Sequence, residues 1–145
     1  MLAASPSRPA PMVVIDASVW ASSLLQHDSN YHAARNWIGS HIANGGSFVA
    51  PLLLVIEISA TISRVTQDAK SGRAAASHLY SFPHMRLVPM DQILVDEAVD
   101  LAAQFHLRGA DALYVAVAKE LSIPLVTFDA EQLARPAAII TTISP

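Results

Sequence analysis

Apolar residues in this chain form short runs that alternate with longer stretches of helical spacing. The short runs, rich in Val and Ile, predict strands over residues 12–16, 47–50, 85–90, 124–129 and 137–143. The stretches with apolar positions three and four apart predict helices over residues 18–25, 31–43, 52–66, 68–82, 91–106, 109–122 and 130–134. Pro51 is predicted at the start of its helix, where a missing amide costs least.

Strands that alternate with helices, each strand apolar throughout, are typical of a parallel sheet covered on both faces. The sequence therefore predicts an α/β fold with three α/β/α layers and a mostly parallel central sheet of about five strands. The helix over 91–106 is predicted to face inward through Ile93, Leu94, Leu101, Ala102 and Phe105.

Length and composition indicate one domain. The chain has 145 residues, of which 52% are hydrophobic, so it can bury a full core. Residues 1–11 contain three prolines and are predicted to be a non-structural extension of a domain over 12–145. No secretion signal and no membrane span is expected, which favours a cytoplasmic protein.

Charge and cysteine content narrow the chemistry. The net charge is −3, so a nucleic-acid partner would need local basic groups or metal ions. Without cysteine, a disulfide framework, a thiolate zinc site and a cysteine nucleophile are all excluded. The six histidines include no i,i+4 pair, which argues against a zinc site on a helix.

Four of the twelve acidic residues lie in apolar sequence: Asp16, Glu57, Asp111 and Asp129. Glu57 lies opposite the polar face of its predicted helix, beside Leu53, Leu54 and Ala60, and a lone buried carboxylate is strongly unfavourable. Each acid also has a structural interpretation. The three aspartates are suited to cap turns or helices, and Glu57 could pair with Arg64.

The expected topology brings the four acids together. If the first strand lies between the second and the fourth, the strand order reverses beside it, and ligands bind at such a reversal. Asp16 and Asp129 end the two strands at this point. Two carboxylates at about 4 Å repel by roughly 4 kcal/mol, so a cluster needs a counter-charge. Mg²⁺ or Mn²⁺ is the cation that prefers oxygen ligands.

Four segments resemble the signature segments of PIN-domain nucleases, particularly VapC-type toxins of toxin–antitoxin pairs. They are VVIDASVW, LLLVIEISATISR, GADALYVAVAKE and LVTFD. The resemblance implies a Mg²⁺- or Mn²⁺-dependent endoribonuclease, dimeric and inhibited by an antitoxin. It also implies that the four acids hold the metal, and that Ser18 and Thr127 orient ligands or water.

Partner contacts are predicted on two further surfaces. Arg64, Lys70 and Arg73 are candidates for RNA phosphate contacts, or form a solvated surface on which Arg64 pairs with Asp68. The first two helices carry more large apolar side chains than core packing needs, so part of this surface should bury against a second subunit or an antitoxin. These side chains are Trp20, Leu24, Leu25, Tyr31 and Trp37.

Three alternatives remain open. A phosphatase of the haloacid dehalogenase type would need an aspartate where Ser18 stands, which disfavours it. A metal-free interaction module would use the acids only as helix caps. A PIN-fold nuclease of RNA maturation would share the site but not the toxic role, and the small size of the chain favours the toxin.

Overall fold

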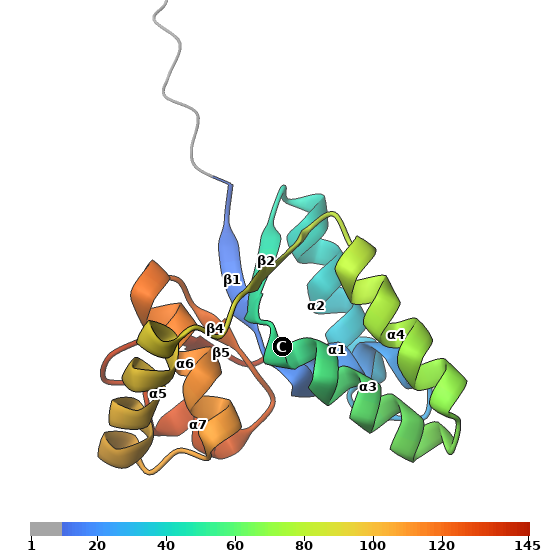
Figure 1. Cartoon of the computed structure of the whole chain (residues 1–145). Helices are drawn as coiled ribbons and strands as arrows, with labels where there is room; N and C mark the ends of the chain where they lie inside the picture. The colour runs from blue at the N-terminus through green and yellow to red at the C-terminus, as the bar shows by residue number, and fades with distance from the viewer. Residues whose placement is uncertain (1–9) are drawn as a thin grey trace, which may run out of the picture.

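The computed structural model describes residues 10–145, so most of the predicted extension lies outside the described residues. Its centre is a sheet of five strands in the order β3-β2-β1-β4-β5 (Figure 1). All four neighbouring pairs are parallel. The strands are β1 (Met12–Ile15), β2 (Ser47–Pro51), β3 (Met85–Val88), β4 (Leu125–Val126) and β5 (Thr142–Ile143). The predicted parallel α/β fold is confirmed.

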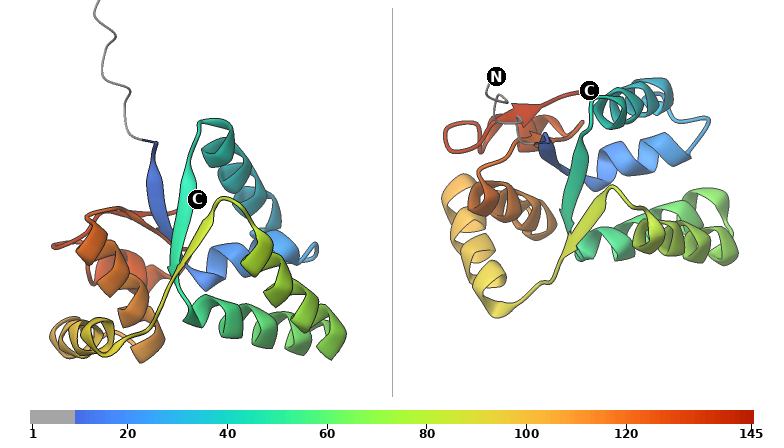
Figure 2. Two further views of the ribbon diagram at one scale, coloured as in Figure 1. Left: turned by 45° about the horizontal axis from the view of Figure 1, so that its top comes forward. Right: turned by 90° about the horizontal axis from the view of Figure 1, so that it is seen from above.

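Seven helices in the described residues surround the sheet. They are α1 (Ala17–Leu24), α2 (Tyr31–Ala43), α3 (Leu53–Thr66), α4 (Ala69–Ser81), α5 (Gln92–Phe105), α6 (Gly109–Leu121) and α7 (Ala130–Ala134). Helices α1 to α4 lie on one side of the central strands, and α5, α6 and α7 lie on the other (Figures 1 and 2). The structure therefore has the three predicted layers.

The strand register fixes the sheet edge where the site forms. Val14 of β1 pairs with Val49 of β2 on one side and with Leu125 of β4 on the other. The chain thus builds β1, β2 and β3 in one direction and places β4 and β5 on the opposite flank of β1. The reversal between β1 and β4 is the predicted one, and it marks the position where an open parallel sheet binds ligands.

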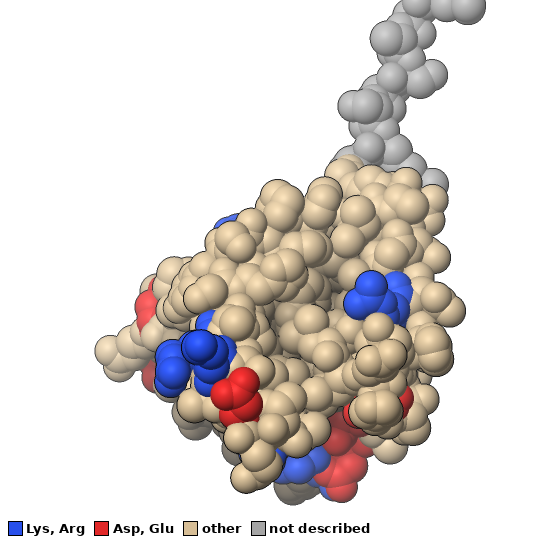
Figure 3. All heavy atoms as spheres, turned by 90° about the vertical axis from the view of Figure 1, so that its right-hand side faces the viewer, with Lys and Arg blue, Asp and Glu red and all other residues tan. Residues whose placement is uncertain are grey.

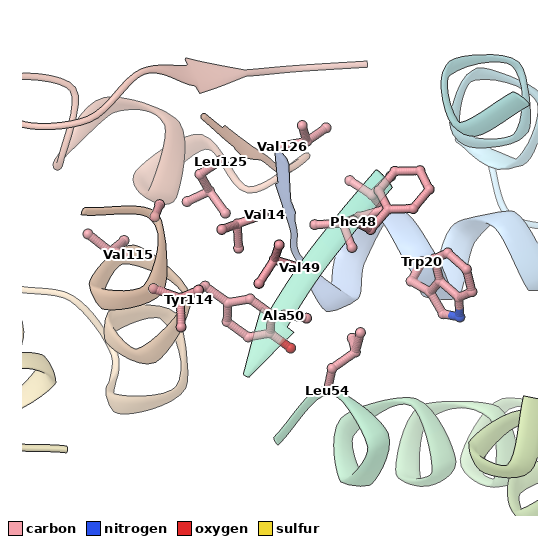
Figure 4. Packing of buried hydrophobic residues seen from close by; sticks show 14 of the residues in the cluster. Val14, Trp20, Phe48, Val49, Ala50, Leu54, Tyr114, Val115, Leu125 and Val126 are labelled. Carbon is pink, nitrogen blue, oxygen red and sulfur yellow. The ribbon is translucent and has the colours of Figure 1, made fainter. Parts of the chain in front are cut away.

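In the three central strands, β1, β2 and β4, every side chain except those of the first residues of β1 and β2 is buried. Tyr114 and Val115 of α6 pack towards the sheet from one side, and Trp20 of α1 lies beyond Phe48 on the other (Figure 4). On the α1 side, α4 approaches α3 closely because Gly72 has no side chain. A Cβ atom there would lie 2.7 Å from the Ser59 carbonyl oxygen.

Three local predictions were wrong. Pro51 is the last residue of β2 and does not begin α3, because it still pairs with Val88 of β3, whose carbonyl accepts from the Leu52 amide at 2.8 Å. Ile93 is 78% exposed and does not face inward, whereas the predicted Leu94 and Leu101 are buried, and Ala102 and Phe105 pack half-buried against the core. The last strand is shorter than predicted, since it comprises only Thr142–Ile143.

Candidate functional site

Asp16 follows β1 directly and is 6% exposed, although it carries a carboxylate. Its Oδ2 atom accepts hydrogen bonds from the Ser18 amide at 3.2 Å and from the Thr127 hydroxyl at 3.0 Å. No hydrogen bond to its Oδ1 atom is found within residues 10–145. A carboxylate this deeply buried is costly unless a cation or further donors compensate it.

Thr127 joins the ends of β1 and β4. Its buried hydroxyl accepts a hydrogen bond from the Asp129 amide at 3.0 Å. The single hydroxyl proton serves either Asp16 Oδ2 or Gln132 Oε1, which lies 2.9 Å away. Ser18 completes the junction, because its hydroxyl accepts from the Phe128 amide at 3.2 Å. These hydroxyls hold the two loops that carry Asp16 and Asp129 at fixed separation.

Glu57 lies on α3, half-buried, and the Tyr114 hydroxyl of α6 donates a hydrogen bond to its Oε1 atom at 2.6 Å. Burial raises the pKa of Glu57, the Tyr114 hydrogen bond lowers it, and the charges of Asp16 and Asp111 raise it further. Tyr114 is fully buried, and burial together with Glu57 raises the pKa of its phenol far above the usual value. The phenol therefore remains a neutral donor. Glu57 was predicted to face the interior together with Leu53, Leu54 and Ala60. This prediction is confirmed only in part, because Leu54 is buried but Ala60 is exposed.

Asp111 lies in the first turn of α6, where an acid is favourable to the helix dipole. Burial raises the pKa of Asp111, Asp16 raises it further, Arg108 lowers it, and Asp129 raises it. The Arg108 side chain bridges two acids: its Nε atom lies 3.4 Å from Asp111 Oδ2, and its Nη2 atom lies 3.0 Å from Asp129 Oδ2. Asp129 uses its other oxygen, Oδ1, to cap α7 through the Gln132 amide at 2.9 Å.

The four acids meet at the carboxyl edge of the sheet. Asp16 interacts electrostatically with Glu57 and Asp111, Asp111 also interacts with Asp129, and Thr127 connects Asp16 to the Asp129 loop. Within residues 10–145, no three acidic or histidine side chains are close enough to hold a metal ion as they stand.

The donor set fits a hard divalent cation. It offers carboxylate oxygens from four residues, one of them on the buried Asp16 and without a protein donor, and no sulfur or imidazole ligand. Charge repulsion between Asp16, Glu57 and Asp111, visible as raised pKa values of Glu57 and Asp111, is the condition that such a cation relieves. Whether these four residues are the metal ligands stays a prediction.

The predicted basic group lies apart from the acids. Arg64 is in the last turn of α3, and Lys70 and Arg73 lie on the exposed surface of α4. Neither suggested partner of Arg64 pairs with it in the described part of the chain: Glu57 binds Tyr114, and Asp68 caps α4 through the Lys70 and Ser71 amides. A role of this group in phosphate binding stays a prediction.

Sequence reasoning missed three residues of the site: Arg108, Tyr114 and Gln132. Gln132 is fully buried and also donates through its Nε2 atom to the Asp111 carbonyl at 3.5 Å. The sequence contains a signal for two of them. Asp129 followed by Gln three residues later is a capping-box pattern, and Arg108 and Asp111 have the i,i+3 spacing of an ion pair on a helix. Nothing local distinguishes Tyr114 from a core residue.

The apolar side chains predicted to bind a partner differ in burial. Trp20 is only 3% exposed, because its ring packs edge-on against Phe48 and Phe82, so its placement on a partner surface was wrong. Leu24 is 38% exposed, and Leu25, Tyr31 and Trp37 are half-buried. Among the described residues, Trp20 Nε1 is the buried side-chain polar atom without a hydrogen-bond partner.

A hollow of about 210 Å³ lies between α1, α2 and the end of α4, on the side of the molecule viewed in Figure 3. Its walls are mainly apolar, with polar groups at Ser23, Arg35 and His78. The apolar lining residues are Trp20, Leu24, Ile38, Ile42 and Phe82.

Comparisons with known proteins place the chain in a family. The model of the PIN domain matches residues 13–138, and the chain belongs to the PIN domain family. The search of curated proteins finds no match. No helix in residues 10–145 is long and apolar enough to cross a membrane.

Solved structures with the same fold include toxins of toxin–antitoxin pairs. VapC20 of Mycobacterium tuberculosis, described as a toxin that cleaves the sarcin-ricin loop, superposes with a TM-score of 0.76 at 19% identity, over 92% of this chain and 99% of that one. FitAcB of Neisseria gonorrhoeae has a TM-score of 0.69 at 18% identity, over 91% and 96% of the two chains. A toxin–antitoxin complex of Klebsiella pneumoniae has a TM-score of 0.65 at 16% identity, over 90% and 95%.

Proposed function

We propose that this protein is a divalent-metal-dependent endoribonuclease and the toxin of a toxin–antitoxin pair. The observation that carries the proposal is Asp16, a buried carboxylate with one oxygen free of protein donors and with Glu57 and Asp111 close enough to interact with its charge. Membership of the PIN domain family and the likeness to VapC20 support the reaction class. We further propose that the activity is cytoplasmic, where an RNA substrate would be met.

Asp16, Glu57, Asp111 and Asp129 would hold Mg²⁺ or Mn²⁺ directly or through water. A cation in this position supplies charge stabilisation for the phosphodiester and lowers the pKa of an attacking water. Thr127 and Ser18 keep the loops of Asp16 and Asp129 in register, and Tyr114 holds one oxygen of Glu57 and leaves the other without a protein donor. The buried Gln132 supports Thr127 from behind.

Cleavage of RNA tests the proposal directly. Pure protein incubated with a structured RNA pool should cut it in millimolar Mg²⁺ or Mn²⁺ and should be inactive in excess EDTA. Asp129→Asn keeps an oxygen for the α7 cap but loses charge, so it should remain folded and lose most of the cleavage. A wild-type protein that cuts nothing in any of these conditions would contradict the nuclease assignment.

We also propose that the hollow between α1, α2 and α4 receives an antitoxin segment. Its lining is mainly apolar, and Arg35 is the cationic residue among its lining residues. A partner there would need an apolar side chain with an acidic group beside it, and one of the similar structures is a toxin–antitoxin complex.

A charged residue in the hollow should block this partner. Leu24→Asp should abolish copurification with the antitoxin expected from the neighbouring gene, because desolvating a carboxylate against the apolar wall is costly. Ile139→Asp is the matched control, since Ile139 is 39% exposed, against 38% for Leu24, and lies outside the hollow. Equal copurification of both variants would refute this location.

A further inference from the structure

The Arg108 guanidinium lies where a divalent cation would bind two of the four acids. It contacts Asp111 Oδ2 and Asp129 Oδ2, and Asp129 Oδ1 is already used by the α7 cap. A metal ion that binds the oxygen of Asp129 outside the cap would bind Oδ2, the atom that Arg108 holds. A divalent cation at this oxygen and the guanidinium would repel each other at such short range.

Arg108 does not contribute to the cap of α6. It is the N-cap residue of α6, yet its side chain makes no capping hydrogen bond. Ser, Thr, Asp and Asn are preferred at this position, and a cation beside a helix N-terminus opposes the helix dipole. The side chain is also 69% exposed, so it can leave the acids without disturbing the core.

We propose that Arg108 has two alternative sets of oxygen partners. In the metal-free protein it neutralises Asp111 and Asp129, and when a divalent ion takes these carboxylates the guanidinium turns to a phosphate of the bound RNA. The inference rests on the proposed nuclease function. Guanidinium binds carboxylate and phosphate with the same planar pair of donors, so one side chain suits both partners.

Physical chemistry predicts opposite effects of Arg108→Gln on two affinities. Mn²⁺ must break the two ion pairs of Arg108 to bind these carboxylates, and exposed ion pairs are weak. Their removal should therefore tighten binding of Mn²⁺ to the RNA-free protein by only about threefold to tenfold. Loss of a charge-assisted phosphate contact should weaken RNA binding by about tenfold. A residue that only stabilised the fold would not shift the two affinities in opposite directions.

The control is Lys119→Gln. Lys119 lies on the same helix and pairs with Glu97 at 2.5 Å, so this variant removes one positive charge from α6 away from the acids. Titration calorimetry with Mn²⁺ alone measures the first affinity. Anisotropy of a labelled mixed-sequence RNA oligonucleotide with phosphorothioate linkages, which slow cleavage, measures the second in millimolar Mn²⁺ with all four acids intact.

The outcomes separate this inference from the function on which it rests. Arg108→Gln should bind Mn²⁺ more tightly and RNA more weakly than Lys119→Gln. If wild type binds Mn²⁺ but Arg108→Gln matches the control in either affinity, the exchange of partners is refuted while the metal site stands. If wild type binds no Mn²⁺, the proposed function fails first.

Discussion

Asp111→Asn distinguishes a residue that stabilises the start of α6 from a residue that binds a metal ion. Asp111 lies in the first turn of α6, with its side chain 19% exposed and near Arg108. Asparagine keeps the shape of the side chain and removes its charge. If Asp111 serves only the helix, the variant should behave like wild type in every assay except for a small change in stability.

The change in stability should be small because two effects oppose each other. Burial and the nearby charges of Asp16 and Asp129 raise the pKa of Asp111, so removing its charge relieves unfavourable interactions. The pair with the exposed Arg108 is lost, at a cost of about 0 to 1 kcal/mol. The free energy of unfolding in EDTA should therefore change by no more than about 1 kcal/mol, or about 3 °C in Tm.

The effect of metal should be much larger. At a Mn²⁺ concentration about 100 times the Kd, wild type should gain about 2.7 kcal/mol of stability by linkage. If loss of one carboxylate weakens the ion about 100-fold, Asp111→Asn gains only about 0.4 kcal/mol at the same concentration. Cleavage should fall about 10³-fold, since the charge stabilisation lost is several kcal/mol.

The assays are thermal melts in EDTA and in Mn²⁺, together with cleavage of an RNA pool. Asp91→Asn is the matched control, because Asp91 is an exposed N-cap whose side chain accepts from the Leu94 amide at 2.9 Å outside the site. It should gain the full stabilisation by Mn²⁺ and cut as wild type does. An Asp111→Asn protein that also gains it in full, or that cuts normally, would refute the metal role of Asp111.

Two further predictions concern protons. The folded-state pKa values of Glu57 and Asp111 are raised, so in EDTA the protein should lose stability as the pH rises from the ordinary carboxyl range through the raised values. Glu57→Gln should therefore be more stable than wild type in EDTA at neutral pH, and this difference in stability should disappear in acid. Melts in EDTA across pH check this, and a difference that grows in acid would contradict it. Tyr114→Phe removes the hydrogen bond that lowers the pKa of Glu57, so the acid limb of the cleavage profile should move to higher pH. An unshifted limb would show that Glu57 does not control this step.

The sequence predicted the fold well because periodicity reports burial. Alternating strand and helix patterns gave the parallel sheet and the position of β4 beside β1, and α2 begins and ends at the predicted residues. Errors arose where tertiary contacts override local preference. Ile93 fits an apolar stripe on α5, but nothing in residues 10–145 covers it, and Pro51 remains in the sheet because β3 pairs with β2 there.

The candidate site was predictable only as far as charge in apolar sequence marks it. Asp16, Glu57, Asp111 and Asp129 stood out because carboxylates rarely occur in such runs. The residues that contact them did not. Tyr114 resembles a core side chain until its hydroxyl is seen at Glu57, and Gln132 resembles a surface position of a short helix until Thr127 is seen beside it.

Capping and metal binding do not exclude each other in this fold. Asp16 caps α1 through Oδ2, and Asp129 caps α7 through Oδ1, so the structural interpretation of both residues is met. Each cap, however, uses one of two oxygens. A cap alone would be served as well by Asn, Ser or Thr, without burying a charge at Asp16 or gathering like charges around it. The capping bond fixes the orientation of the carboxylate and leaves the second oxygen of each residue outside the cap. If the proposed metal site is correct, the two caps would also hold the ligands of the cation in place, so loss of charge at these positions should impair chemistry far more than folding.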